Sequence, residues 1–122
     1  MKDKERKIHE LKELIKEFCE ERDWDQFHGA KELAVALIIE SAELLEHFRW
    51  KNPEEVEKML SDEKKREEIG DEMADVLYFL IRIAQKYNID LTDALEKKMK
   101  KNDEKYPIEK ARGSNKKYDE LD

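Results

Sequence analysis

The chain contains few of the residues that interrupt helices or form covalent cross-links. Its 122 residues include three glycines, two prolines and one cysteine, whereas lysine, glutamate and leucine are abundant. This composition favours long helices over a sheet, and the length suits one domain with a single core. A lone cysteine cannot form a disulfide within the chain. Because Cys19 lies on a predicted amphipathic helix, we expect it to be a buried or half-buried apolar side chain rather than a nucleophile.

The chain also lacks the apolar segments that target or anchor proteins. Residues 1–6 are charged and contain no apolar signal region, and no apolar run reaches membrane-spanning length. We therefore expect a cytoplasmic protein without a membrane partner. The formal net charge is −7 at pH 7, and charged residues make up 47% of the chain. Since binding to a phosphate backbone needs a basic surface, this charge argues against general nucleic-acid binding.

The helical spacing of apolar residues predicts the secondary structure. Four main helices are expected over about residues 4–22, 31–50, 61–87 and 91–105. The predicted fold class is therefore all-α. We expect the domain to span residues 1–107. Residues 108–122 lack a clear apolar period and are expected to form a loose tail.

Several residues predict helix ends. Asn52 and Pro53 suit the cap and the first position of a short helix, which should end near Leu60. Ser61 is expected to cap the third main helix, and Asn88 is expected to stop it.

Two pairs of acidic residues interrupt otherwise apolar helix faces. Glu40 and Glu43 lie on the second main helix, and Glu72 and Asp75 lie on the third. Residues three apart share a helix face, so each pair can direct two carboxylates to one point. Burying ionised carboxylates is costly without a counter-charge, and an all-oxygen ligand set suits Mg²⁺ or Mn²⁺. The pattern is consistent with a divalent metal site at these four acids.

Acidic spacing by itself leaves an alternative open. Acidic pairs three residues apart also occur at Glu10/Glu13 and Glu54/Glu57, where we expect solvated helix surface. The two pairs on the apolar faces could likewise lie at the edge of an apolar stripe, reach solvent and pair with lysines. Considered without any known family, the metal site and the stripe edge are about equally supported by the residues.

Four motifs, in order along the chain, resemble the all-α nucleotide pyrophosphohydrolases of the MazG type. They are residues 21–28 (ERDWDQFH), 40–51 (ESAELLEHFRWK), 72–75 (EMAD) and 98–107 (KMKKNDEKYP). The first, the second and the last look most like the dCTP pyrophosphatase branch. The resemblance spans about residues 8–107, with the motifs in the family's order.

The resemblance implies a role for each matching residue. Glu40, Glu43, Glu72 and Asp75 would be the catalytic acids and Mg²⁺ ligands, with Mn²⁺ as a substitute. Glu43 is favoured as the acid that also activates water, because Glu46 and His47 are its neighbours in sequence. The residues that would bind the nucleotide or lie near its phosphates are Trp24, Asp25, Gln26, Phe27, His28, Trp50, Phe79, Lys98 and Asn102.

Two positions depart from the branch's pattern. Phe79 stands where the branch often has tyrosine, and Ile15 stands where it has a polar residue. Both changes leave the nucleotide preference open without affecting the acids.

The resemblance also implies a fold, an activity and an assembly. The fold would be the four-helix-bundle-like MazG fold, completed by oligomerisation. The activity would be Mg²⁺-dependent hydrolysis of a (deoxy)nucleoside triphosphate to the monophosphate and pyrophosphate, with dCTP or a modified dCTP favoured, to cleanse the nucleotide pool. The assembly would be a homotetramer built from two dimers, with residues 24–28 close to a neighbouring chain.

Two other classes of protein are alternatives to this interpretation. A di-iron helical bundle needs Glu-x-x-His pairs, and neither acidic pair has a histidine three residues on. A non-catalytic helical oligomerisation module would not need the polar and aromatic residues 24–28, and it should bind neither Mg²⁺ nor a nucleotide. Nucleotide binding and hydrolysis therefore discriminate the enzyme from the module.

Overall fold

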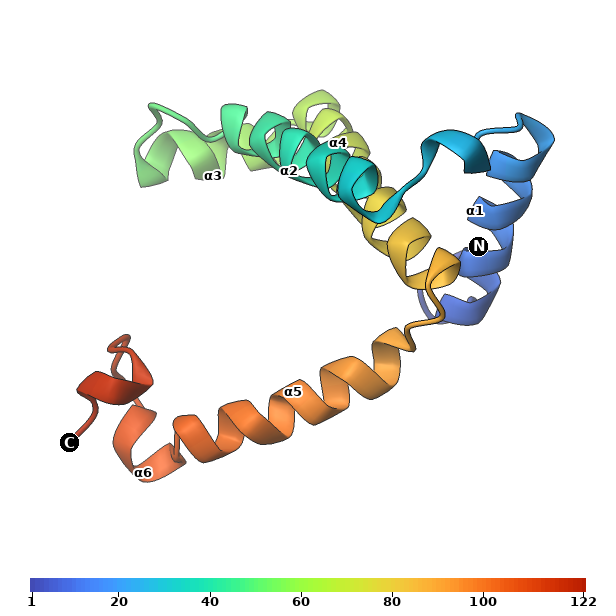
Figure 1. Ribbon diagram of the computed structural model, residues 1–122. Coiled ribbons are helices and arrows are strands. Elements are labelled where there is room, and N and C mark those ends of the chain that lie inside the picture. Colours follow the sequence, from blue (N-terminus) through green and yellow to red (C-terminus); the bar gives the residue numbers. More distant parts are fainter. The chain divides into compact units, whose positions relative to one another are not determined.

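The chain folds into helices joined by short connections (Figure 1). The computed structural model describes residues 1–122 and contains no strand, which confirms the all-α prediction. Residues 1–88 and residues 89–122 form two compact units. The first unit contains α1 (Ile8–Glu21), η1 (Asp25–Phe27), α2 (Ala30–Glu46), α3 (Pro53–Ser61) and α4 (Glu63–Lys86). The second unit contains α5 (Leu91–Lys105), α6 (Ile108–Ala111) and η2 (Tyr118–Glu120).

The helices α2 and α4 form the centre of the first unit and lie side by side (Figure 1). The short α3 reverses the chain between them, so the two helices are antiparallel. Two contacts fix this direction. His28, before α2, contacts Arg82 near the end of α4, and His47, after α2, contacts Glu72 in the first half of α4. The middle of α2 therefore faces the middle of α4.

Local signals explain where α3 and α4 begin. The side chain of Asn52 accepts the Glu55 N–H at 2.9 Å, and Glu55 accepts the Asn52 N–H at 3.3 Å. This confirms the predicted start of α3. The prediction that Ser61 caps the next helix is wrong, because Asp62 accepts the Lys65 N–H at 3.0 Å and Ser61 belongs to α3. A carboxylate caps a helix and also interacts favourably with the positive end of its dipole.

The first unit has a small apolar core. The buried apolar side chains are Cys19, Leu33, Ile69, Ile81 and Ala84. Burial of Cys19 confirms its predicted role as a packed apolar residue. Many other apolar residues of α2 and α4 are exposed. Seven of them, here called the exposed apolar face, are Val35, Ile38, Ile39, Leu45, Met73, Leu77 and Leu80.

The second unit begins just after the end of α4. Asn88 has a left-handed backbone (φ 55°), as expected for a residue that stops a helix. Within this unit the Tyr106 and Tyr118 rings meet edge to face, with centroids 6.3 Å apart, so η2 packs next to the end of α5. The predicted domain boundary at residue 107 and the predicted loose tail stay predictions. None of the helices is both long and apolar enough to cross a membrane.

Candidate functional site

Three of the predicted acids form a tight cluster between α2 and α4. Glu40 and Glu43 on α2 and Glu72 on α4 each offer a carboxylate oxygen, and these oxygens lie within 4.8 Å of one another. The first two share a face of α2 because they are three residues apart, and the antiparallel α4 brings Glu72 to that face. Glu40 and Glu72 are half-buried, whereas Glu43 is exposed. The carboxylates thus converge, while their role as metal ligands stays a prediction.

Two oxygens of the acid cluster are buried without a partner. The Oε2 atoms of Glu40 and Glu72 have no hydrogen-bond partner. Burial raises the pKa of the Glu40 carboxyl above its ordinary value, and the neighbouring carboxylates raise it further. Burial also raises the pKa of Glu72, where Glu43 adds the largest charge effect and His47 opposes it. A cation at this point would remove both the unsatisfied oxygens and the repulsion.

The acid cluster fits a hard divalent cation. It offers oxygen ligands only, which suits Mg²⁺ or Mn²⁺. Asp75 lies outside the tight cluster and is exposed. Its charge still raises the pKa values of Glu40 and Glu72, so it lies next to the cluster. Glu40, Glu43 and Glu72 would hold the cation, with Asp75 adjacent.

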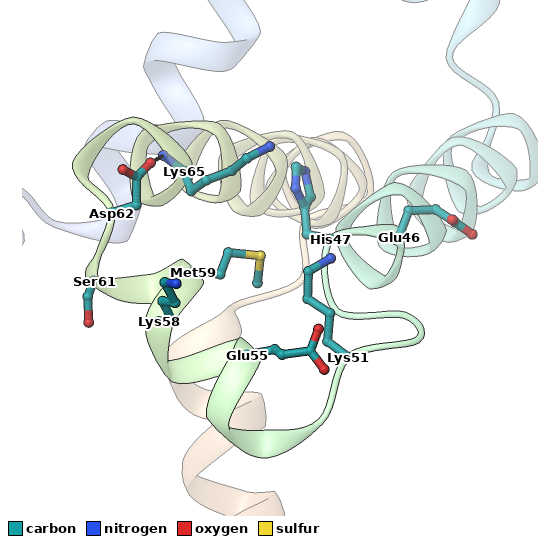
Figure 2. A pocket seen from close by; sticks show the side chains of 9 residues that line it. All are labelled: Glu46, His47, Lys51, Glu55, Lys58, Met59, Ser61, Asp62 and Lys65. Atoms are coloured by element: carbon teal, nitrogen blue, oxygen red, sulfur yellow. Dashed lines mark hydrogen bonds between the residues drawn. The ribbon is translucent and has the colours of Figure 1, made fainter.

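His47 connects the acid cluster to an open cleft of about 770 Å³. Its Nε2 atom lies 3.8 Å from Oε1 of Glu72, and its expected effect on Glu43 stays a prediction. Figure 2 shows the cleft between the end of α2, α3 and the start of α4. Its charged walls are Lys51, Lys58, Lys65, Glu46, Glu55 and Asp62. Because lysines and acids balance there, the formal charges of these walls do not favour an anion.

Residues 23–29, here called the aromatic loop, are held on α4 by polar contacts. Arg82 donates from Nε to His28 Nδ1 at 3.0 Å and from Nη2 to Asp25 Oδ1 at 2.9 Å. Lys86 Nζ donates to the backbone carbonyl of Asp25 at 2.9 Å and to that of His28. Asp25 and His28 therefore contact α4. Their predicted role in the nucleotide pocket stays a prediction.

The aromatic side chains of the loop remain partly open. Trp24 is 38% exposed and packs edge to face on Phe18, with ring centroids 5.6 Å apart. Phe27 is 64% exposed. Gln26 turns back on the loop, because its Nε2 donates to the Asp23 carbonyl at 3.0 Å. Phe18 also lines an apolar hollow of about 310 Å³ with Leu14, Ile15 and Tyr78.

The predicted pocket residues lie at different points along α2 and α4. Trp24 precedes α2 and Trp50 follows it. Between them in the chain lies α2, whose 17 residues span about 25 Å. Glu40 lies between them, about 15 Å from the start of the helix. The shared role of both tryptophans in one nucleotide pocket stays a prediction.

Trp50 has an unusual environment for a tryptophan. Its side chain is 86% exposed, and its backbone is left-handed with φ 66°. The Arg49 guanidinium carbon lies 4.6 Å from the Trp50 ring centroid. A left-handed backbone costs a non-glycine residue about 1–2 kcal/mol, and such strain clusters at functional sites.

The remaining predicted residues lie on α4 and α5. Phe79 lies one turn beyond Asp75, is half-buried, and meets the Tyr78 ring edge to face with centroids 4.9 Å apart. Lys98 is exposed and Asn102 is half-buried on α5, in the second unit. Their closeness to the phosphates stays a prediction.

Sequence reasoning missed Arg82 and Lys86, which anchor the aromatic loop. Arg82 is 1% exposed, which is unusual because charged side chains are rarely fully buried. One signal was available, because Arg82 is the only charged residue in the apolar run of residues 76–84. Its loop partners His28 and Asp25 lie more than 50 residues away in sequence, so the pattern could not identify them.

Comparisons with known proteins indicate one family for this chain. The MazG-like family matches residues 35–121, a range that contains all four acids. The dCTP pyrophosphatase 1 proteins of Mus musculus and Homo sapiens are each 38% identical over 114 residues, which is 93% of this chain and 67% of theirs. The crystal structure of a pyrophosphatase from Archaeoglobus fulgidus is similar with a TM-score of 0.76 and 39% identity, covering 82% of this chain and 92% of that one.

Proposed function

We propose that this chain, which belongs to the MazG-like family, converts a nucleoside triphosphate to the monophosphate and pyrophosphate with Mg²⁺ or Mn²⁺. The family and the similar solved structure make it a pyrophosphatase-type hydrolase. The observation that carries the proposal is the acid cluster. Three carboxylates converge there, and two of their buried oxygens lack a partner. A cation with its bound phosphates would meet that need.

The acids would divide the chemical work. A bound divalent cation would polarise phosphate oxygens and offset the charge that develops during displacement. Glu40 and Glu72 would hold it with their buried oxygens. Glu43 is exposed and touches both, so solvent reaches it most easily. We assign to Glu43 the orientation and deprotonation of the attacking water.

We propose dCTP, or dCTP modified on its base, as the preferred substrate. The relatives at 38% identity are named dCTP pyrophosphatase 1. The aromatic loop offers partly exposed rings on which a base can stack. Because stacking tolerates any base, a preference for one base must come from the other walls of the pocket. The hollow lined by Ile15 is apolar and lies against Phe18, on which Trp24 packs. An apolar wall there favours an alkylated base over a more polar one.

A nucleotide panel tests this function directly. The protein is incubated with Mg²⁺ and each natural deoxynucleoside and ribonucleoside triphosphate, together with 5-methyl-dCTP. Products are separated by chromatography. We expect the monophosphate and pyrophosphate, with dCTP or 5-methyl-dCTP turned over most efficiently. If purine nucleotides are the best substrates, the proposed preference for dCTP is wrong but the pyrophosphohydrolase function stands. If no nucleotide is hydrolysed, the function is wrong and the non-catalytic oligomerisation module is favoured.

We also propose that the active form is a homo-oligomer, a tetramer built from two dimers. Two observations support it. The exposed apolar face places seven large side chains of α2 and α4 in water. Trp24 precedes α2 and Trp50 follows it, and in the proposed assembly a second copy would bring the two kinds of ring to one pocket. Packing α2 and α4 of two copies together would cover the face and supply the missing pocket wall.

Sedimentation equilibrium of wild type and Ile38→Glu tests the assembly. Ile38 is 67% exposed on the apolar face, so a carboxylate there should be buried in the interface and dissociate the oligomer. We expect a mass well above 14.7 kDa for wild type and for the control Lys31→Glu, an exposed α2 position outside the apolar face. Ile38→Glu should shift to the monomer and lose activity. A fully active wild type at the monomer mass at every concentration would contradict the proposal.

A further inference from the structure

The aromatic loop contacts α4 through polar groups and leaves part of its ring surface in solvent. Asp25 is itself 63% exposed, yet one of its carboxylate oxygens accepts from Arg82, and the half-buried His28 accepts from Arg82 through Nδ1. Phe27 is 64% exposed, whereas Trp24 is 38% exposed and packs against Phe18. The loop is therefore anchored to α4 through its polar groups, while the ring of Phe27 and part of the ring of Trp24 stay open.

Arg82 is the centre of this anchor. Its side chain is 1% exposed, and all three of its guanidinium nitrogens donate to protein acceptors. Nε donates to His28 Nδ1 at 3.0 Å, Nη2 donates to Asp25 Oδ1 at 2.9 Å, and Nη1 donates to Gln85 Oε1. A buried guanidinium is costly unless its donors are satisfied. Two of the three acceptors belong to the loop, so the buried charge is stable only while the loop is docked.

The same contact sets the protonation of His28. A guanidinium has donors and no acceptor, so His28 Nδ1 must be unprotonated to receive the Arg82 N–H. Neutral His28 then carries its proton on Nε2. Burial lowers the pKa of His28, and the positive charges of Arg82 and Lys86 on α4 lower it further, while Asp25 in the loop opposes them.

We infer that Arg82 is a positioning residue of the nucleotide pocket, which docks the aromatic loop on α4, fixes the positions of the Trp24 and Phe27 rings, and holds His28 as the Nε2–H tautomer. Lys86 assists by binding the two loop carbonyls. The inference rests on the proposed function, since the loop positioned in this way is the proposed base-binding element. Arg82 acts through the loop and does not contact the acid cluster.

Steady-state kinetics with dCTP and Mg²⁺ separate positioning from catalysis. Arg82→Lys keeps the charge but cannot satisfy three acceptors in a fork, and Lys86→Met removes the carbonyl contacts without burying an unpaired charge. Each should raise KM roughly ten- to 100-fold, since a misplacement of about 1 Å can cost that much. The acids are untouched, so kcat should stay within about threefold of wild type. Arg66→Lys, elsewhere on α4 with only the Leu60 carbonyl as its partner, is the matched control and should match wild type.

A second readout does not depend on activity. In a Trp50→Phe background the emission of Trp24 alone reports whether the loop is docked. Arg82→Lys should shift this emission to the red, toward that of a solvated indole, while far-ultraviolet circular dichroism stays unchanged. Falling pH should produce a similar shift in the parent below the ordinary His28 pKa of 6.5, because the protonated ring loses its acceptor. His28→Asn, which keeps an acceptor near Nδ1 but does not titrate, should abolish that pH transition.

The two readouts distinguish failure of this inference from failure of the function. If wild type hydrolyses dCTP while Arg82→Lys and Lys86→Met leave both KM and Trp24 emission unchanged, the positioning role is wrong. A fall in kcat at constant KM would also overturn it, because it would place Arg82 in the chemical step. If wild type hydrolyses no nucleotide, the proposed function fails, and the emission shifts still decide whether Arg82 docks the loop.

Discussion

Replacement of Glu72 by glutamine should remove nearly all pyrophosphohydrolase activity. The change keeps the size of the side chain and removes one of the charges that would hold the cation. Loss of partners outside the ligand set already costs metalloenzymes about 10–100-fold, so loss of a ligand should cost at least about 100-fold in kcat. Glu40→Gln, Glu43→Gln and Asp75→Asn should act in the same direction. Released pyrophosphate measured with and without excess EDTA checks this, and wild type should be inactive in EDTA.

Stability without metal provides the control for that loss. Because the pKa values of Glu40 and Glu72 are raised in the folded chain, the folded state keeps protons that the unfolded state has lost. Their contribution to stability is present below the ordinary glutamate pKa of 4.5 and is lost as pH rises through the raised values. At neutral pH in EDTA, Glu72→Gln should therefore melt a few degrees higher than wild type. Glu68→Gln, one turn earlier on α4, should keep its activity.

Two results would contradict the role of the acids. One is full turnover of wild type in excess EDTA. The other is an active Glu72→Gln protein whose affinity for Mn²⁺, measured by isothermal titration, equals that of wild type. If Glu72→Gln is inactive because it is unfolded, Glu72→Asp replaces it, since aspartate keeps the charge and has a shorter side chain. Its loss of metal affinity should then parallel its loss of activity.

Replacement of Trp24 by alanine should weaken nucleotide binding by about 1–3 kcal/mol if the ring stacks on the base, which corresponds to a roughly five- to 150-fold rise in Kd. The ring is partly exposed and held edge to face on Phe18, so its open surface can receive a base. Titration of dCTP with Ca²⁺ in place of Mg²⁺ measures binding without turnover. Trp24→Phe keeps an aromatic ring and should recover most of the affinity.

The loop substitution and the acid substitutions should separate kinetically. Trp24→Ala should raise KM with little change in kcat, because it leaves the acids in place. The Phe18 ring loses a packing partner, so the melting temperature is measured alongside. Unchanged dCTP affinity in a folded Trp24→Ala protein would remove this residue from the base pocket.

Local physics explains why the bounds of α3, α4 and α5 were predictable to within about two residues, whereas α1 begins and α2 ends about four residues inside the predicted bounds. Asn52 and Glu55 satisfy each other's N–H groups at the start of α3, and Pro53 has no N–H that needs an acceptor. In the same way, α5 begins and ends where the apolar period and Pro107 predict. The Ser61 error has the same local origin. Two adjacent residues could cap α4, and the carboxylate of Asp62 interacts with the helix dipole more strongly than a hydroxyl.

The acids show how far spacing alone can go. Glu40, Glu43 and Glu72 converge because helix geometry sets the positions of residues three apart and the antiparallel α4 supplies the third carboxylate. Spacing could not show that Asp75 lies outside the tight cluster, or that Glu40 and Glu72 each bury an unpartnered oxygen. These depend on how closely α2 and α4 pack.

The sequence by itself therefore determined the helices, the acidic pairs and the family, because each rests on short-range periodicity or on an ordered set of motifs. Only the tertiary structure decided that Arg82, one charged residue in a chain that is 47% charged, is buried. It also decided that Asp25 and His28 meet Arg82. The burial of the Arg82 charge depends on acceptors more than 50 residues away in sequence. A one-dimensional pattern carries no information about such contacts.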